Sequence, residues 1–173
     1  MALLKLIIYP DNTLTRACTA VKSFDKELLA DIDNMFESMK FYRGLGLAAN
    51  QVGIDKKMFV MDLTESKSKS MNDRQYCFIN PEIEIVDKVL NDFEEGCLSF
   101  PEQNVWIARP SAVKIKYFDE KGNYHEDVAS DLAAVCIQHE FDHINGITMH
   151  DRASSLFEKQ AIFKKAQKLK KKY

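Results

Sequence analysis

The stretch that decides the fold is Asp131-Leu132-Ala133-Ala134-Val135-Cys136-Ile137-Gln138-His139-Glu140-Phe141-Asp142-His143-Ile144-Asn145-Gly146. Its apolar residues recur at three- and four-residue spacing, which predicts an amphipathic helix that starts at Asp131 and stops at Asn145-Gly146. His139 and His143 are four residues apart and share one face, so both can bind one ion, with Glu140 beside it. A structural helix with two solvated histidines is the alternative reading of the same pattern.

A metal site of this kind needs a third protein ligand from elsewhere in the chain. Cys136 lies on the same helix, but it is seven residues from His143, about 10.5 Å along the axis, so one ion cannot bind both. Of the other three cysteines, only Cys97 follows a glycine, Gly96, that frees the backbone to orient the thiol. We therefore predict that Cys97 joins His139 and His143 as a metal ligand.

The remaining chain predicts further helices and antiparallel strands. An apolar repeat predicts a helix over 25–41 with Ser23 as its cap, and a final basic helix is expected at about 155–171. Residues 44–51, rich in small side chains, are expected to form a loop. Runs rich in Val, Ile and aromatic residues predict strands at 58–63, 76–80, 82–90, 112–118 and 124–129.

Together these elements predict the α+β class. We expect one compact domain over residues 1–173, with antiparallel strands packed around a central metal-binding helix and with helices near both termini. The chain has 173 residues, 46% of them hydrophobic and 29% charged, which is too apolar for a disordered protein.

The start of the chain shows neither a basic leader nor a cleavage site, and no apolar run reaches about 18 residues. We therefore expect a cytoplasmic protein without a membrane partner. In a reducing compartment the four cysteines are expected to be free thiols or metal ligands rather than disulfides.

The net charge of −2 conceals an uneven distribution. Residues 154–173 hold seven lysines against one acid and carry +6, so the remainder carries −8. Such a tail suits a polyanionic partner, and ribosomal RNA is the partner we expect, with no role for DNA. A solvated amphipathic helix is the alternative.

Three segments carry a family resemblance: Gly44-Leu45-Gly46-Leu47-Ala48-Ala49-Asn50-Gln51, Glu95-Gly96-Cys97-Leu98-Ser99 and Gln138-His139-Glu140-Phe141-Asp142-His143. They resemble the three signature motifs of peptide deformylases, in the family's order and at similar separations. The likeness extends over nearly the whole chain, including Tyr9-Pro10-Asp11 and Ile79-Asn80-Pro81-Glu82. The resemblance implies a metal-dependent hydrolase that removes the formyl group from the N-terminal N-formylmethionine of newly synthesised proteins and releases formate.

The resemblance also implies a role for each site residue. Glu140 would be the catalytic acid and base, while the Gln51 side-chain amide and the Leu98 backbone N–H would stabilise the developing oxyanion. Water would take the fourth metal position. The implied metal ligands are Cys97, His139 and His143. A tetrahedral set of one thiolate and two imidazoles by itself suggests zinc, whereas the family generally uses Fe2+, so we expect Fe2+, with Zn2+, Ni2+ or Co2+ able to substitute.

Nascent formylmethionyl peptides are the substrates that the resemblance implies. Backbone hydrogen bonds to an extended peptide are expected from Gly44, Leu45 and Gly46. Val135 and Cys136, one turn before His139, are expected to line the pocket for the methionine side chain, with ordinary core packing as the alternative.

One position departs from the family pattern. Many members have an arginine where this chain has Asn104, which leaves contacts to the peptide backbone open and predicts altered substrate preference rather than lost activity. Arg109 is expected to pair with Glu95 or Asp142 and so to support the ligands.

Two other functions remain at this stage. One is a zinc peptidase that cuts internal bonds, against which the thiolate ligand and the glycine-rich first motif argue. The other is a catalytically silent paralogue that binds ribosomes or peptides through the same groove.

Overall fold

The protein is described by a computed structural model that covers residues 2–64, 70–72 and 74–170. In this part of the chain a five-stranded antiparallel sheet has the order β1-β2-β3-β4-β5. The strands are β1 (Gly46–Ala48), β2 (Met58–Asp62), β3 (Gln75–Gly96), β4 (Asn104–Phe118) and β5 (Tyr124–Ser130). The helices are α1 (Lys26–Phe41), α2 (Asp131–Ile144), α3 (Met149–Arg152) and α4 (Leu156–Leu169), with short 3-10 helices η1 (Asn12–Thr15) and η2 (Ala49–Val52).

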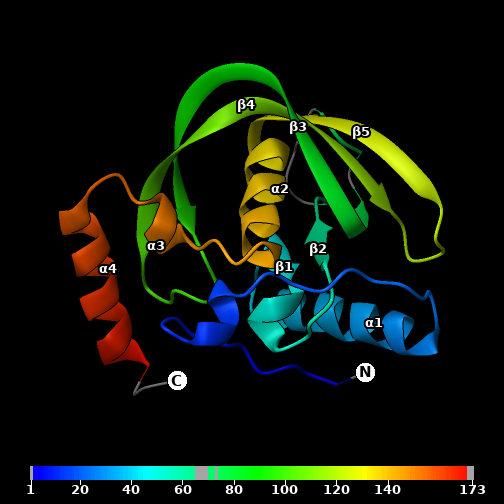
Figure 1. Cartoon of the computed structure of the whole chain (residues 1–173), viewed down its shortest axis with the longest axis horizontal. Helices are drawn as coiled ribbons and strands as arrows, with labels where there is room; N and C mark the ends of the chain where they lie inside the picture. Colours follow the sequence, from blue (N-terminus) through cyan, green and yellow to red (C-terminus); the bar gives the residue numbers. More distant parts are fainter. Residues whose placement is uncertain (1, 65–69, 73, 171–173) are drawn as a thin grey trace.

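Helix α2 is the centre of the fold. It runs beneath the arch formed by β3 and β4 (Figure 1) and packs against β4, β1 and β2. Every residue from 133 to 140 is buried, and the small side chains of Ala133 and Ala134 let the sheet approach closely. This arrangement confirms the predicted α+β class with antiparallel strands around a central helix.

Strand β3 is longer than the sequence predicted. Residues 76–80 and 82–90 belong to one strand, because the ladder with β4 shifts its register between Ile79 and Glu82 and then resumes. The strand bends here because Pro81 has no N–H to donate and Asn80 takes a positive φ of 49°. The Asn80 side chain stabilises the bend, since its Oδ1 accepts from the Val21 N–H and its Nδ2 donates to the Val21 carbonyl. The prediction of two separate strands is wrong.

Helix α1 packs on the other side of β1 and β2, with Leu28, Ile32, Met35 and Met39 buried in a second part of the core. Its cap is Asp25, whose carboxylate accepts from the Leu28 N–H at 3.0 Å. Ser23 donates to that carboxylate instead of capping the helix, so the predicted cap is wrong by two residues.

Residues 44–51 do not form the expected loop. Residues 46–48 pair with β2 as strand β1, and η2 follows at once. The small side chains that suggested a loop instead allow residues 46–51 to lie buried against α2, where Ala48 and Ala49 have no exposed surface.

The C-terminal helix begins within one residue of its predicted start and ends at Leu169. Its predicted end, residue 171, lies outside the described residues. Helix α4 lies at the edge of the molecule (Figure 1) and contacts the body through buried Ile162 and Ala166. None of the helices in the described ranges is both long enough and apolar enough to cross a bilayer.

Candidate active site

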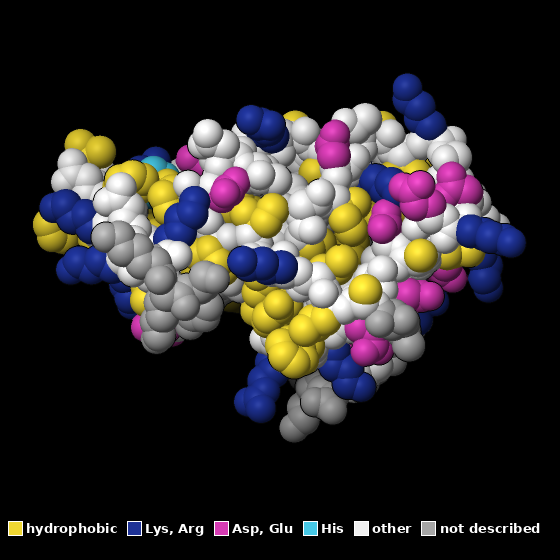
Figure 2. Space-filling view, turned by 90° about the horizontal axis from the view of Figure 1, so that it is seen from below, with side chains coloured by type: hydrophobic (Ala, Val, Ile, Leu, Met, Phe, Trp, Pro, Cys, Tyr) yellow, Lys and Arg dark blue, Asp and Glu magenta, His cyan; other side chains and the backbone are white. Residues whose placement is uncertain are grey.

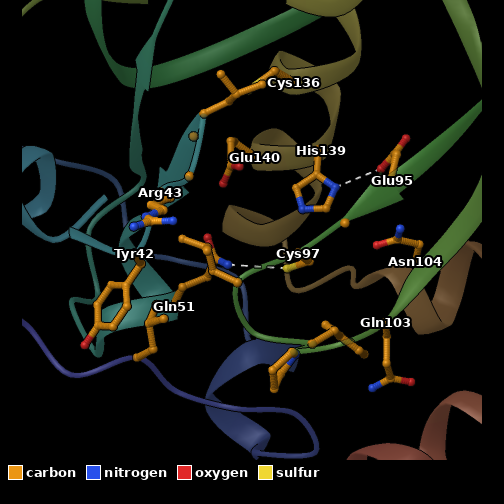
Figure 3. A pocket seen from close by; sticks show the side chains of 18 of the residues that line it. Tyr42, Arg43, Gln51, Glu95, Cys97, Gln103, Asn104, Cys136, His139 and Glu140 are labelled. Atoms are coloured by element: carbon orange, nitrogen blue, oxygen red, sulfur yellow. Dashed lines mark hydrogen bonds and ion pairs between the residues drawn. The ribbon is translucent and has the colours of Figure 1, made fainter. Parts of the chain in front are cut away.

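Three side chains from two distant segments converge on one point. Helix α2 presents His139 and His143, and the turn that follows β3 presents Cys97; Figure 3 shows His139 and Cys97. Their donor atoms all lie within 4.8 Å of one another, and the Cys97 Sγ is 3.2 Å from the His143 Nε2. A tetrahedral ion with metal–sulfur and metal–nitrogen bonds of about 2.3 and 2.0 Å needs ligands separated by roughly 3.5 Å, so the donors present fit one divalent ion. Within the described residues no other group of this kind occurs.

A buried ion-pair network fixes the orientation of His139. The His139 Nδ1 lies 2.8 Å from the Glu95 Oε2, and Arg109 donates to both oxygens of Glu95 at 2.6 and 2.9 Å. Arg109 also donates to Asp142 at 2.7 Å. The predicted pairing of Arg109 with Glu95 or Asp142 is therefore confirmed, and it occurs with both.

This network keeps Glu95 charged. Burial acts to raise the pKa of Glu95, but the hydrogen bonds from Arg109 and His139 outweigh it and hold that pKa below its ordinary value. An anionic Glu95 accepts a hydrogen bond from the His139 Nδ1–H, which leaves Nε2 without a proton and available to bind an ion beside Cys97.

Two supporting contacts were not predicted. Arg152, from α3, donates to both oxygens of Asp142 at 2.9 and 2.5 Å. The Asn50 Nδ2 donates to the His143 carbonyl at 2.5 Å and ties η2 to the end of α2. Asn50 lies inside the first motif, which was the available signal, whereas nothing local in the sequence marks Arg152.

The Gln51 side chain is held in one orientation beside the ligands. Its Oε1 accepts from the Ala48 N–H at 2.8 Å, so its amide N–H groups must point the other way. They reach the Ser99 hydroxyl at 3.2 Å and the Cys97 sulfur at 3.5 Å (Figure 3). A fully buried amide donor is thereby aimed at the point where the ligands meet.

Glu140 packs against bare backbone. A Cβ placed on Gly46 would lie 2.6 Å from the Glu140 Oε1, so only glycine leaves room for this carboxylate. The Glu140 Oε2 is buried and has no partner in the described part of the chain. Burial raises the pKa of Glu140 to about 7, which suits a group that gains and loses a proton near neutral pH.

A cavity of about 710 Å³ opens onto these groups. The catalytic candidates Gln51, Leu98 and Glu140 lie on its wall, and so do the candidate metal ligands Cys97 and His139. The candidate substrate-binding residues Gly44, Leu45, Gly46, Val135 and Cys136 also line it, and so does Asn104. Val135 and Cys136 are at the same time part of the buried interior, so core packing and pocket lining coincide at this turn of α2.

Comparisons with known proteins agree with this geometry. The profile of a family described as "Polypeptide deformylase" matches residues 3–159. A peptide deformylase of Pseudomonas aeruginosa is 42% identical over 168 residues, which cover 97% of this chain and 96% of that protein. The peptide deformylase of Cellvibrio japonicus is 40% identical with the same coverage.

Solved structures give the same result. A peptide deformylase from Legionella pneumophila superposes with a TM-score of 0.89 at 34% identity, over 98% of this chain and 96% of that one. The enzyme from Ehrlichia chaffeensis, in complex with actinonin, superposes with a TM-score of 0.90 at 35% identity, over 99% and 98%. The chain therefore belongs to the polypeptide deformylase family.

Proposed function

We propose that Cys97, His139 and His143 hold a divalent metal ion, and that Glu140 beside them carries out the proton transfers of amide hydrolysis. The reaction is the one performed by the family: removal of the formyl group from the N-terminal N-formylmethionine of newly synthesised proteins. The observation that carries the assignment of roles is the convergence of three donor atoms within 4.8 Å next to a buried carboxyl group with one unpartnered oxygen.

The proposed ion is Fe2+, which the family resemblance implies, with Zn2+, Ni2+ or Co2+ as substitutes, although the donor set by itself suggests zinc. One thiolate and two neutral imidazoles leave a dication with net positive charge and one open position. When bound, the ion supplies a Lewis acid that lowers the pKa of water and polarises the formyl carbonyl.

The protein's own groups complete the chemistry. Glu140 removes a proton as water adds to the formyl carbon, and it returns that proton to the amine nitrogen as the C–N bond breaks, giving formate and a free methionine amine. The Gln51 Nε2–H and the Leu98 backbone N–H stabilise the negative charge that develops on the formyl oxygen. The hydrogen bond from Ala48 preorganises Gln51 for this task, since the amide cannot rotate without losing it.

The proposal also includes the residues that bind the peptide substrate. Gly44, Leu45 and Gly46 bond the backbone of an extended peptide, and Val135 and Cys136 contact the methionine side chain. The whole chain, residues 1–173, acts as one catalytic domain. Nascent formylated peptides are made in the cytoplasm, so the protein is placed there.

A ribosomal partner for α4 belongs to the proposal as well. Figure 2 shows Lys and Arg together with hydrophobic side chains at the end of the molecule where α4 lies, whereas the opposite end carries most of the acidic side chains together with further Lys and Arg. Reversing the charge of Lys164 and Lys168, both exposed, is expected to reduce co-sedimentation with ribosomes at low salt. Unchanged co-sedimentation would argue against this partner.

Formate release by anaerobically prepared protein from an N-formylmethionyl peptide tests the central proposal. Glu140→Gln is expected to retain the metal and lose at least about 100-fold in kcat. Internal cleavage of unformylated peptides would instead support the zinc peptidase. A protein that holds metal yet releases no formate would support the silent paralogue.

A further inference from the structure

Helix α1 ends in a Schellman motif that has an unusual residue at its key position. The Gly44 N–H donates to the Met39 carbonyl at 2.9 Å, and the Arg43 N–H donates to the Lys40 carbonyl at 3.1 Å. Between these bonds Arg43 has a left-handed backbone, with φ of 59°. Glycine is the residue usually found here because a Cβ is unfavourable in this conformation. An arginine at this point suggests that its side chain has a use.

The position of the Arg43 side chain indicates that use. Arg43, in the turn between α1 and β1, lines the cavity and lies, in Figure 3, across it from Glu95 and Asn104. Its side chain is exposed, and within the described ranges its guanidinium forms no hydrogen bond or ion pair. Lys5 lines the same cavity, whereas the facing wall carries Glu94.

We propose that Arg43 determines substrate specificity by binding an acidic side chain among the residues that follow formylmethionine. This inference rests on the proposed function, because it assumes that a formylated peptide occupies the cavity. A guanidinium offers several donors that match the geometry of a carboxylate.

The spacing between Arg43 and Gly46, the first residue of β1, indicates which residue of the bound peptide lies near Arg43. Glu140 touches Gly46, so the reacting formyl group belongs at that end of the segment. Arg43 lies three residues before Gly46, across a bend at Leu45, so it is at most about 10 Å away, which is the distance that three residues of an extended peptide span at roughly 3.3 Å each. An extended peptide lying beside this segment therefore brings its third residue, counting formylmethionine as the first, opposite Arg43.

The test compares kcat/KM for formyl-Met-Ala-Xaa-Ala-amide peptides in which Xaa is Glu, Gln or Lys. The wild-type protein is expected to prefer Glu over Gln by about threefold, as for an exposed ion pair, with the difference in KM rather than kcat. Arg43→Glu should reverse the order and favour Lys, and Arg43→Gly, which suits the positive φ, should remove the preference. The preference should shrink in 0.5 M salt.

Lys22→Glu is the matched control, because it changes the net charge by the same amount at an exposed site outside the cavity. It should keep the wild-type preference. The inference would be overturned if the ratio of kcat/KM for the Glu peptide to that for the Lys peptide were the same in wild type and Arg43→Glu. It would also be overturned if Lys22→Glu changed this ratio as much as Arg43→Glu does. Hydrolysis of the Gln peptide reports the proposed function separately, since a failure there would overturn the function and this inference with it.

Discussion

The Arg109 guanidinium pairs with both Glu95 and Asp142, and replacing Arg109 with methionine affects the two carboxylates differently. Methionine fills similar space but leaves the Glu95 carboxylate, whose side chain is only 3% exposed, with the His139 N–H as its remaining donor. Asp142 loses less, because Arg152 still donates two hydrogen bonds to it. The expected damage is therefore concentrated at Glu95, the group that orients His139, a proposed metal ligand.

The expected loss of stability follows from the burial of the Glu95 charge, which loses its ion-pair partner. Removing one partner of a buried ion pair lowers the free energy of unfolding by about 3–5 kcal/mol. For a chain of this length each kcal/mol corresponds to about 2–4 °C, so the melting temperature at pH 7 should fall by roughly 6–20 °C. The affinity for the metal ion should fall by about 10- to 100-fold as His139 loses its fixed orientation.

A second variant shows whether the unpaired charge is the cause. Arg109→Met combined with Glu95→Gln removes the charge and keeps an acceptor for His139, so it should recover most of the lost stability. Arg152→Ala is the control, since this half-exposed partner leaves Arg109 in place on Asp142, and it should cost about 1 kcal/mol.

The dependence on pH gives an independent check. In the wild type Glu95 has a lowered pKa, so its contribution to stability is present above the ordinary carboxyl pKa of about 4.3 and is lost as pH falls through the lowered value. In Arg109→Met that contribution is gone, so the stability difference should be largest near neutral pH and should narrow in acid. Denaturant titrations from pH 3 to 8 measure it. A difference below about 1 kcal/mol at pH 7, or one that does not change with pH, would refute this account.

Three further predictions concern other parts of the site. Gly46→Ala should lower kcat/KM by about 100-fold while metal content is retained, because the added Cβ would lie only 2.6 Å from the Glu140 Oε1 and would displace the carboxylate. Near-normal activity would contradict the placement of Glu140. Arg43→Gly should raise the free energy of unfolding by about 0.5–1 kcal/mol in thermal melts, since it relieves a left-handed arginine, and a loss of stability would contradict that strain. Removal of the ion by a chelator should lower the melting temperature, and Fe2+ added without oxygen should restore it, whereas an unchanged melting temperature would argue against a site at Cys97.

The central helix was predictable because its signal is local. The spacing of His139 and His143, the apolar face between Leu132 and Ile144, and the stop at Gly146 all lie within one short segment. Cys97 could be chosen as the third candidate ligand from helix geometry, which excludes Cys136, and from the neighbouring glycine. Such features depend on residues next to each other in the chain, so tertiary packing does not overrule them.

The errors arose where distant contacts decide the local structure. Residues 46–48 form a strand only because β2 pairs with them, and the 3-residue length carries no periodic signal. Pro81 normally argues against a continuous strand, but Val21, 59 residues away from Asn80, supports the bend. The hydrogen bond from Asn50 to His143 spans 93 residues, which no local pattern can indicate.

The site depends on two buried glutamates whose surroundings move their pKa values in opposite directions. Arg109 and His139 keep Glu95 charged, whereas Glu140 lies against uncharged backbone and burial raises its pKa to about 7. A Glu95 that stays charged near neutral pH is suited to holding His139, because the orienting hydrogen bond then does not change with pH in that range. A carboxyl group that titrates near neutrality is suited to moving a proton, because it must be able both to accept and to release it. The two roles are incompatible in one environment, so the guanidinium has to pair with Glu95 and not with Glu140.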